Sequence, residues 1–256
     1  MRAFAAFFKK ELTEQLRTSK LAVLFILFVL FGIMNPAVAK MTPWLLEMFA
    51  ESLSESGITI SPTEVSALDS WVQFYKNIPM ALIAFVLIES GIFTKEYSSG
   101  TLVLSLTKGV PRAVVVLSKI ASLVSVFSIG YFSTFAITYA YNAYFWDNSI
   151  ARSLLFSVFC YWLFGIFTIA LLTLFSVLLR SNSGVLLGVG AAVFIAYLIG
   201  FIPKIKQALP LMLADGTSLI YGVRDASEYV VAVITTAVLS MAFFLVSIPI
   251  FNKKQL

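Results

Sequence analysis

Six long stretches of the chain contain almost no charged residue, and they constrain its fold more than any other feature. They cover residues 21–39, 77–88 with an extension to 93, 120–146, 153–179, 181–203 and 229–251. Crossing a hydrocarbon core about 30 Å thick takes roughly 20 apolar helical residues. Inside lipid, only helices or closed barrels satisfy every backbone polar group. The sequence therefore predicts a chain that crosses a membrane six times.

Helices are the better of these two solutions, because barrel strands alternate between apolar and polar residues and these runs are continuously apolar. The composition, 60% hydrophobic and 12% charged, also lies outside the range of ordinary soluble domains. We therefore expect an all-α integral membrane protein with six transmembrane helices, forming a single membrane domain over residues 1–256.

The first 20 residues predict a further helix at the membrane surface. An apolar stripe recurs there every four residues: Phe4, Phe8, Leu12 and Leu16. Charged residues such as Lys9, Lys10, Glu14 and Arg17 lie off this stripe. Because such a pattern suits a helix lying in the interface, residues 1–20 are predicted to form an amphipathic interfacial helix.

The distribution of basic residues predicts the orientation. Twelve of the 18 fall on one side of the predicted spans: Arg2, Lys9, Lys10, Arg17, Lys20, Lys95, Lys108, Arg112, Lys119, Arg180, Lys253 and Lys254. Since Lys and Arg concentrate in cytoplasmic loops, both termini are expected in the cytoplasm. The net charge of +5 then reflects topology and anionic lipid, and nucleic-acid binding is not needed to explain it.

Several chemistries are excluded by the residues present. The chain has no His and one Cys, Cys160, inside an apolar run, which is too few ligands for a zinc, haem or thiol-redox centre. No G-x-x-x-x-G-K-[ST] phosphate-binding motif occurs. We therefore expect that this chain is not an enzyme and binds no cofactor. Cys160 is expected to be a buried apolar residue.

A polar, glycine-punctuated segment, KEYSSGTLVLSLTKGVPR at residues 95–112, separates the second and third predicted spans. It reads as a short helix bounded by Gly100 and by a Gly–Pro break. An acidic residue, Gly-Thr, an amphipathic run and a Pro-Arg turn with a following Lys occur in order: Glu96, Gly100, Thr101, Pro111, Arg112 and Lys119. In this combination the segment resembles the cytoplasmic coupling segment of type-2 ABC export permeases, the six-helix membrane subunits of ABC transporters.

The resemblance implies that separate cytoplasmic ABC ATPase subunits hold ATP and Mg and drive the permease through residues 95–112. It also implies a second permease chain, as a homodimer or a heterodimer. Leu102, Leu104 and Leu106 form the apolar face expected to seat in a partner cleft or against the membrane surface. The alternative is a basic loop that only helps to fix topology.

Small residues recur every four positions in the fifth predicted span: Gly184, Gly188, Ala192, Ala196 and Gly200. Such a stripe allows close approach of two helices in lipid. Its partner is either a helix of the same chain or a second permease subunit, because helices two and five of type-2 export permeases approach a central pathway.

Two polar residues interrupt the spans. Glu89 is the one carboxylate inside a run, and an ionisable group in a membrane is a functional candidate. Since it lies seven residues before Glu96, both are expected on one helix face with Lys95 or Arg112 as ion partners. A structural salt bridge and a transport-coupled carboxylate both remain open. Asn35, before Pro36, marks a kink with a structural or a ligand-binding role.

Two longer segments face outward in this topology, residues 40–76 and 204–228. The first carries an acidic row, Glu47, Glu51 and Glu55, which is either the solvated face of a surface helix or a vestibule for cationic substrates. The second is interrupted by Pro210, Gly216 and Gly222, so it is a re-entrant element closing a pathway or an ordinary loop.

Together these features predict the permease subunit of an ATP-driven ABC exporter in a prokaryotic plasma membrane. The expected substrate is hydrophobic, amphipathic or peptide-like. The alternative is an ATP-independent secondary carrier or a membrane scaffold. A carrier would be expected to show charged or broken helices near the midplane.

Overall fold

The computed structural model describes residues 2–48, 64–107 and 109–254, and helices account for most of them, with no strand in these ranges. Six of the described helices are long and apolar enough to cross a membrane: α2 (Lys20–Met48), α4 (Ala67–Glu89), α7 (Arg112–Phe145), α8 (Leu154–Leu178), α9 (Asn182–Ile199) and α12 (Val230–Lys253). The prediction of an all-α membrane protein with six spans is confirmed.

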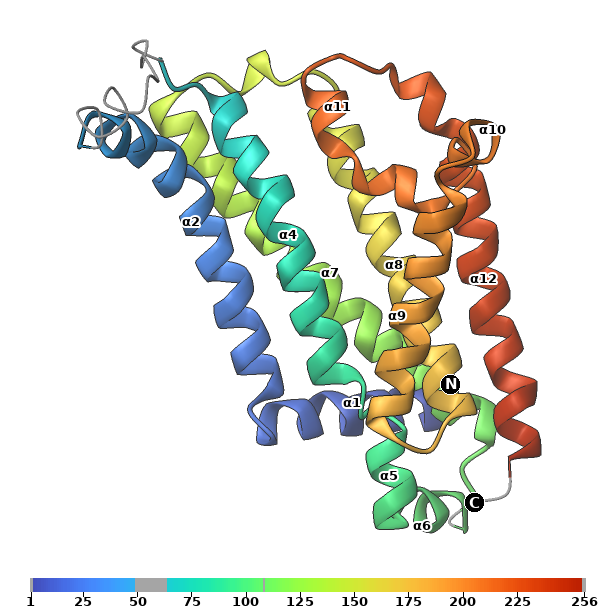
Figure 1. Ribbon diagram of the computed structural model, residues 1–256. Coiled ribbons are helices and arrows are strands. Elements are labelled where there is room, and N and C mark those ends of the chain that lie inside the picture. Colours follow the sequence, from blue (N-terminus) through green and yellow to red (C-terminus); the bar gives the residue numbers. More distant parts are fainter. Residues whose placement is uncertain (1, 49–63, 108, 255–256) are drawn as a thin grey trace.

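The spans run side by side, and α1 (Arg2–Arg17) lies across one end of the bundle, almost perpendicular to them (Figure 1). The short helices α5 (Thr94–Ser99) and α6 (Thr101–Thr107) and the last turn of α12 lie at the same end. The helices α10 (Pro203–Lys206) and α11 (Gly216–Ile220) lie at the opposite end. Segments rich in Lys and Arg are thus gathered at one end of the molecule.

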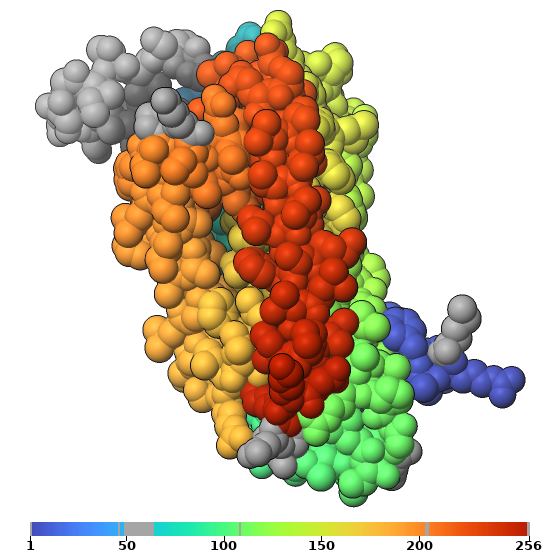
Figure 2. All heavy atoms as spheres, turned by 90° about the vertical axis from the view of Figure 1, so that its right-hand side faces the viewer, coloured from blue at the N-terminus to red at the C-terminus, as the bar shows by residue number. Residues whose placement is uncertain are grey.

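Packing differs strongly between the spans. Helix α8 is the most buried of the six and α9 the most exposed. Helix α1 packs on α7 and on the start of α2, and Figure 2 shows its beginning extending past the side of the bundle. Cys160 of α8 is fully buried, as predicted.

Helices extend from both sides into the range predicted as an outer loop, residues 40–76. Helix α2 continues to Met48, and α4 begins at Ala67 rather than at 77. The backbone N–H of Ser66 donates to Asp69 Oδ2 at 2.8 Å, which satisfies a polar group at the start of α4. Glu47 therefore belongs to α2, and Glu51 and Glu55 lie outside the described residues.

The segment over residues 204–228 folds back against the bundle instead of forming an open loop. It contains α10, the 3-10 turn η2 (Pro210–Ala214), α11 and the 3-10 turn η3 (Ala226–Tyr229). Leu213 and Ile220 are fully buried. A Cβ on Gly216 would lie 2.1 Å from Cε1 of Tyr75 in α4, so the close contact of α11 with α4 requires glycine.

Asn35 forms hydrogen bonds between three of the spans. Its side chain is fully buried, its Oδ1 accepts from Asn77 Nδ2 at 2.8 Å, and its Nδ2 donates to Thr138 Oγ1 at 3.0 Å. The residue therefore joins α2 to α4 and α7 by interhelical hydrogen bonds, the kind that holds spans together in lipid.

Candidate functional site

The segment between α4 and α7 forms two short helices at an angle set by one glycine. Helix α5 ends at Gly100, whose φ of +69° lies in the left-handed region. Glycine adopts this region without steric cost, and a Cβ at this position would meet no atom within 4 Å. The requirement for glycine is therefore conformational. Gly109, with φ +84°, and Pro111 follow α6 and begin the turn into α7; Lys108 lies outside the described residues.

The three leucines of α6 do not share one face, contrary to the sequence-based expectation. Leu102 is 1% exposed, and Leu106 also packs against the core. Leu104 points away and is 61% exposed. Because residues 102 and 106 are four apart and 104 lies between them, the helix turns its middle leucine outward. Val103 and Leu104 thus form an exposed apolar edge on the end of the molecule that carries α1.

A closed ring of four charged residues holds α5 against α1 and α7. Lys10 Nζ lies 2.5 Å from Glu96 Oε1 and 3.0 Å from Glu11 Oε1. Lys119 Nζ lies 3.0 Å from Glu96 Oε2 and 2.9 Å from Glu11 Oε2. Two ammonium groups and two carboxylates therefore alternate around the ring. We call Lys10, Glu11, Glu96 and Lys119 the ionic ring.

Three of the four side chains of the ionic ring are buried, whereas that of Lys10 is 40% exposed. The side chains of Glu11, Glu96 and Lys119 are 8% exposed or less. Burial alone would lower the pKa of Lys10, but its hydrogen bond to Glu96 and the nearby Glu11 carboxylate outweigh burial and raise that pKa. Lys10 therefore carries its charge. Since buried ion pairs add little net stability while loss of one partner is costly, the ring acts mainly to fix geometry.

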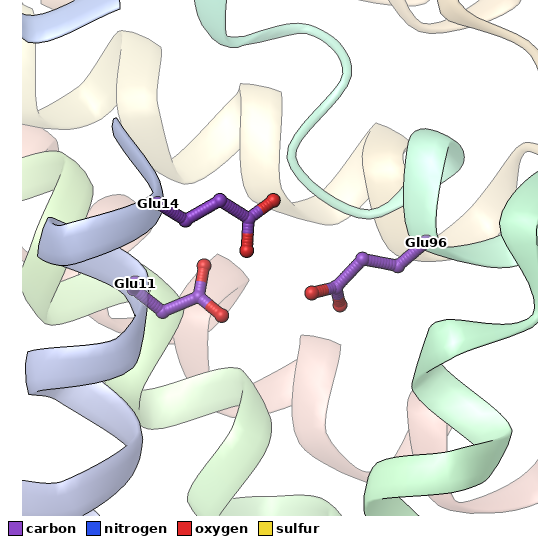
Figure 3. Close-up of side chains that lie close together, drawn as sticks. All are labelled: Glu11, Glu14 and Glu96. Atoms are coloured by element: carbon purple, nitrogen blue, oxygen red, sulfur yellow. The ribbon is translucent and has the colours of Figure 1, made fainter. Parts of the chain in front are cut away.

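Glu11, Glu14 and Glu96 bring carboxylate oxygens within 4.8 Å of one another, an arrangement that resembles a cation site. Figure 3 shows Glu11 and Glu14 of α1 extending toward Glu96 of α5. The ammonium of Lys10 lies between 2.5 and 3.0 Å from an oxygen of each of the three. A lysine of the chain itself therefore supplies the positive charge at this position, and the arrangement calls for no metal ion.

Glu89 lies next to the ionic ring, but its partner differs from the predicted one. Lys20 Nζ lies 3.3 Å from Glu89 Oε2, whereas Lys95 or Arg112 was expected. The expectation failed because α4 ends at Glu89 and the chain turns before α5 begins. Glu89 and Glu96 therefore belong to different helices, although both line the same small recess. The corner between α1 and α2 brings Lys20 to Glu89.

Arg112, at the end of the α5–α6 segment, forms hydrogen bonds with the end of α12. Its Nη1 donates to the carbonyl oxygens of Phe251, Asn252 and Lys254 at 2.8–3.0 Å. These carbonyls close the last turn of α12, where a helix has unpaired acceptors and a negative dipole end. The Pro-Arg turn found in the sequence is thus an intramolecular cap that binds the start of α7 to the end of α12.

Lys254 makes a similar cap at the end of α8. Its Nζ donates to the carbonyl oxygens of Val177, Leu178 and Leu179, at the end of α8, and lies 4.2 Å from the centre of the Tyr97 ring in α5. Burial, with the Arg180 charge adding to it, lowers the pKa of Lys254 to about 8. Helices α5, α8 and α12 therefore meet at this lysine.

The small-residue stripe of α9 packs within the same chain at its second position, Gly188. A Cβ at Gly188 would lie 2.5 Å from Cδ1 of Phe175 in α8, so any larger side chain would collide with this ring. Ala192 and Ala196 are half-buried, Gly184 donates its N–H to the capping Ser181 Oγ, and Gly200 ends the helix. Of the two partners considered, the structure places α8 of the same chain beside Gly188.

A broad apolar groove separates α4 from α9, with α8 behind it. Its volume is about 540 Å³. Residues from all three helices line it, among them Pro79, Ile83, Leu87, Phe164, Phe194 and Tyr197. No charged side chain lies along it among the described residues. The groove thus lies between the second and the fifth span.

These features define an integral membrane protein with six spans, a helix lying across one end of the bundle and a two-helix segment tied to them by buried charges. A profile of the ABC-2 family transporter proteins matches residues 5–220, which include α1, the α5–α6 segment and five of the spans. The chain belongs to this family and is the permease subunit of an ABC transporter. No curated protein matches the chain closely enough to be informative.

Proposed function

We propose that this permease works in an ATP-driven exporter, in which α5 and α6 receive the motion of separate cytoplasmic ATPase subunits. The ionic ring is the observation that carries the proposal. It ties α5 to α1 through Lys10 and Glu11 and to α7 through Lys119. A displacement of α5 therefore moves the interfacial helix and a span together, because separating buried charges is costly.

The exposed edge of α6 is the proposed contact for the ATPase. Val103 and Leu104 are 43% and 61% exposed on the end of the molecule where the basic residues gather. That end faces the cytoplasm under the positive-inside rule, which places both termini there too. ATP and Mg belong to the partner subunits in this proposal, and the family is one of transport subunits rather than enzymes.

The groove between α4 and α9 is the proposed wall of the export pathway. Its volume of about 540 Å³ falls within the range of ligand pockets, roughly 300–1,000 Å³. Because the lining is apolar, a hydrophobic, amphipathic or peptide-like substrate fits it best. A second permease chain, identical or related, would complete the pathway opposite α9, the most exposed of the spans. A prokaryotic plasma membrane is the proposed location.

Reconstitution tests the proposal. The permease is placed in proteoliposomes with the ATPase chain that co-purifies with it, and ATP hydrolysis and substrate export are measured together. Export that depends on ATP, on the ATPase chain and on Glu96, with Ser98→Ala as the exposed control in α5, is the expected result. Export driven by an ion gradient without any ATPase would instead assign the chain to secondary carriers.

A further inference from the structure

A second apolar recess lies on another side of the bundle, in the angle between α1 and the spans α2 and α7. Its volume is about 410 Å³. Phe8, Leu12 and Leu16 of α1 form one wall, Phe25 and Phe28 of α2 a second, and Ile129 of α7 a third. The recess therefore has the interfacial helix at one side and spans above it, and it plays no part in the groove between α4 and α9.

The recess opens toward the lipid side of the bundle. Leu16, Phe25 and Ile129 at its margins are 60%, 46% and 62% exposed, whereas Phe28 at its base is 1% exposed. Apolar side chains exposed along membrane-spanning helices face acyl chains. From Lys20 to Phe28 the helix rises about 12 Å, close to half of a hydrocarbon core of about 30 Å. The recess thus spans much of one leaflet.

Exposed basic residues lie on the flank of α1 opposite Glu11 and Gln15. At about 100° per residue, Lys9, Arg2 and Arg17 fall roughly 60°, 80° and 140° from Leu12 on one side. All three are exposed. Glu11 and Gln15 lie on the other side, buried against α7. The apolar wall of the recess is therefore bordered by positive charge on its open side only.

The geometry points to a binding site for one anionic phospholipid of the inner leaflet. One acyl chain occupies the recess between α1, α2 and α7, and the phosphate lies beside Lys9 and Arg17. Anionic headgroups are attracted to basic residues at the cytoplasmic surface, and an amphipathic interfacial helix buries its apolar side among acyl chains. The bound lipid fills the angle that α1 makes with the spans, and so it supports the orientation in which α1 presents the ionic ring. The site does not depend on an ATPase.

Photo-labelling in nanodiscs tests the site. The intact protein is reconstituted with phosphatidylglycerol that carries a photo-reactive group on its acyl chain, and the labelled peptides are mapped by mass spectrometry. Labels are expected to concentrate on residues 8–16, 21–28 and 125–130. The matching phosphatidylcholine probe is expected to label them less. Uniform labelling of all exposed spans, or equal labelling by both lipids, would overturn the site.

Two pairs of variants sharpen the test. Ser125→Phe fills the recess and is expected to reduce labelling there, whereas Ile26→Phe, on the exposed side of α2, is its control. Lys9→Gln with Arg17→Gln is expected to lower the preference for the anionic lipid by roughly fivefold per charge, and Lys253→Gln is the matched basic control. Unchanged labelling in the filled variant would contradict the acyl-chain site. Displacement of the lipid by inorganic phosphate alone would make it a simple anion site and would also contradict the proposal.

Discussion

The ammonium of Lys119 in α7 lies 3.0 Å from the carboxylate of Glu96 in α5, and both side chains are almost completely buried. The pair joins the segment proposed to meet an ATPase directly to a membrane span. Lys119 also contacts Glu11 of α1 at 2.9 Å, so three helices share one ammonium group. A movement of α5 alone would leave charges without partners in a region that water scarcely reaches.

Lys119→Met is predicted to destabilise the protein strongly. It leaves Glu11 and Glu96 with fewer positive partners, and removal of one member of a buried ion pair costs about 3–5 kcal/mol. Unfolding followed in detergent measures the loss. Lys95→Met removes an exposed lysine from the same segment and is expected to change the free energy of unfolding by less than about 0.5 kcal/mol. Equal effects of the two variants would show that the ionic ring does not contribute to the stability of the fold.

Lys20 and Glu89 allow a charge-exchange test, since the structure gives Glu89 one ion pair among the described residues. Lys20→Glu and Glu89→Lys are each predicted to destabilise the protein. The double variant restores an opposite pair, so part of the stability should return, with a coupling of about 0.5–3 kcal/mol. Additive losses in the double variant would mean that the two side chains do not interact in the folded protein.

The sequence was sufficient to predict the spans and a separate amphipathic helix before them, because apolar length and helical periodicity are properties of single segments. It also identified Glu96 and Lys119 as members of one motif, that of the coupling segment. It did not reveal Lys10 and Glu11 as their partners, because those contacts depend on how α1 lies across the bundle. The available signal was a Lys-Glu pair beside the apolar stripe of an amphipathic helix, which is common in solvated helices.

The errors have the same origin. Lys95 and Arg112 were expected to pair with Glu89 because one continuous helix was assumed through residues 89–96, whereas α4 ends at Glu89. Arg112 caps α12 instead, a contact between segments far apart in the chain. Leu104 was grouped with Leu102 and Leu106 by composition, although the helical period places it on the opposite side.

Gly100→Val is predicted to disturb the angle between α5 and α6 without preventing membrane insertion. A β-branched residue at a φ of +69° costs about 1–3 kcal/mol, so the chain there is expected to adopt another conformation. Insertion and folding should persist, while ATPase activity that depends on the permease should fall. Ser99→Val, in an ordinary helical position, is the control. Normal coupling in Gly100→Val would remove the role assigned to this turn.

Arg112→Met is predicted to loosen the end of α12. The guanidinium satisfies three carbonyl oxygens there, and a charge at a helix end contributes about 0.3–1 kcal/mol, more when partly buried. Hydrogen exchange should quicken in the last turn of α12 and remain unchanged in α2. Unaltered exchange at residues 249–254 would show that the cap does not hold this end.

Cross-linking at position 104 tests the central claim most directly. A photo-reactive amino acid replaces Leu104, the most exposed large apolar side chain of α6, in the permease in native membranes, and the product is identified by mass spectrometry. Replacement of Val223, 75% exposed and located between α11 and η3, is the control. The account predicts a cross-link from position 104 to an ATPase chain with a phosphate-binding motif, enhanced or altered by ATP, and none from position 223. An ATPase that supports transport but cross-links at neither position, or only at position 223, would contradict it.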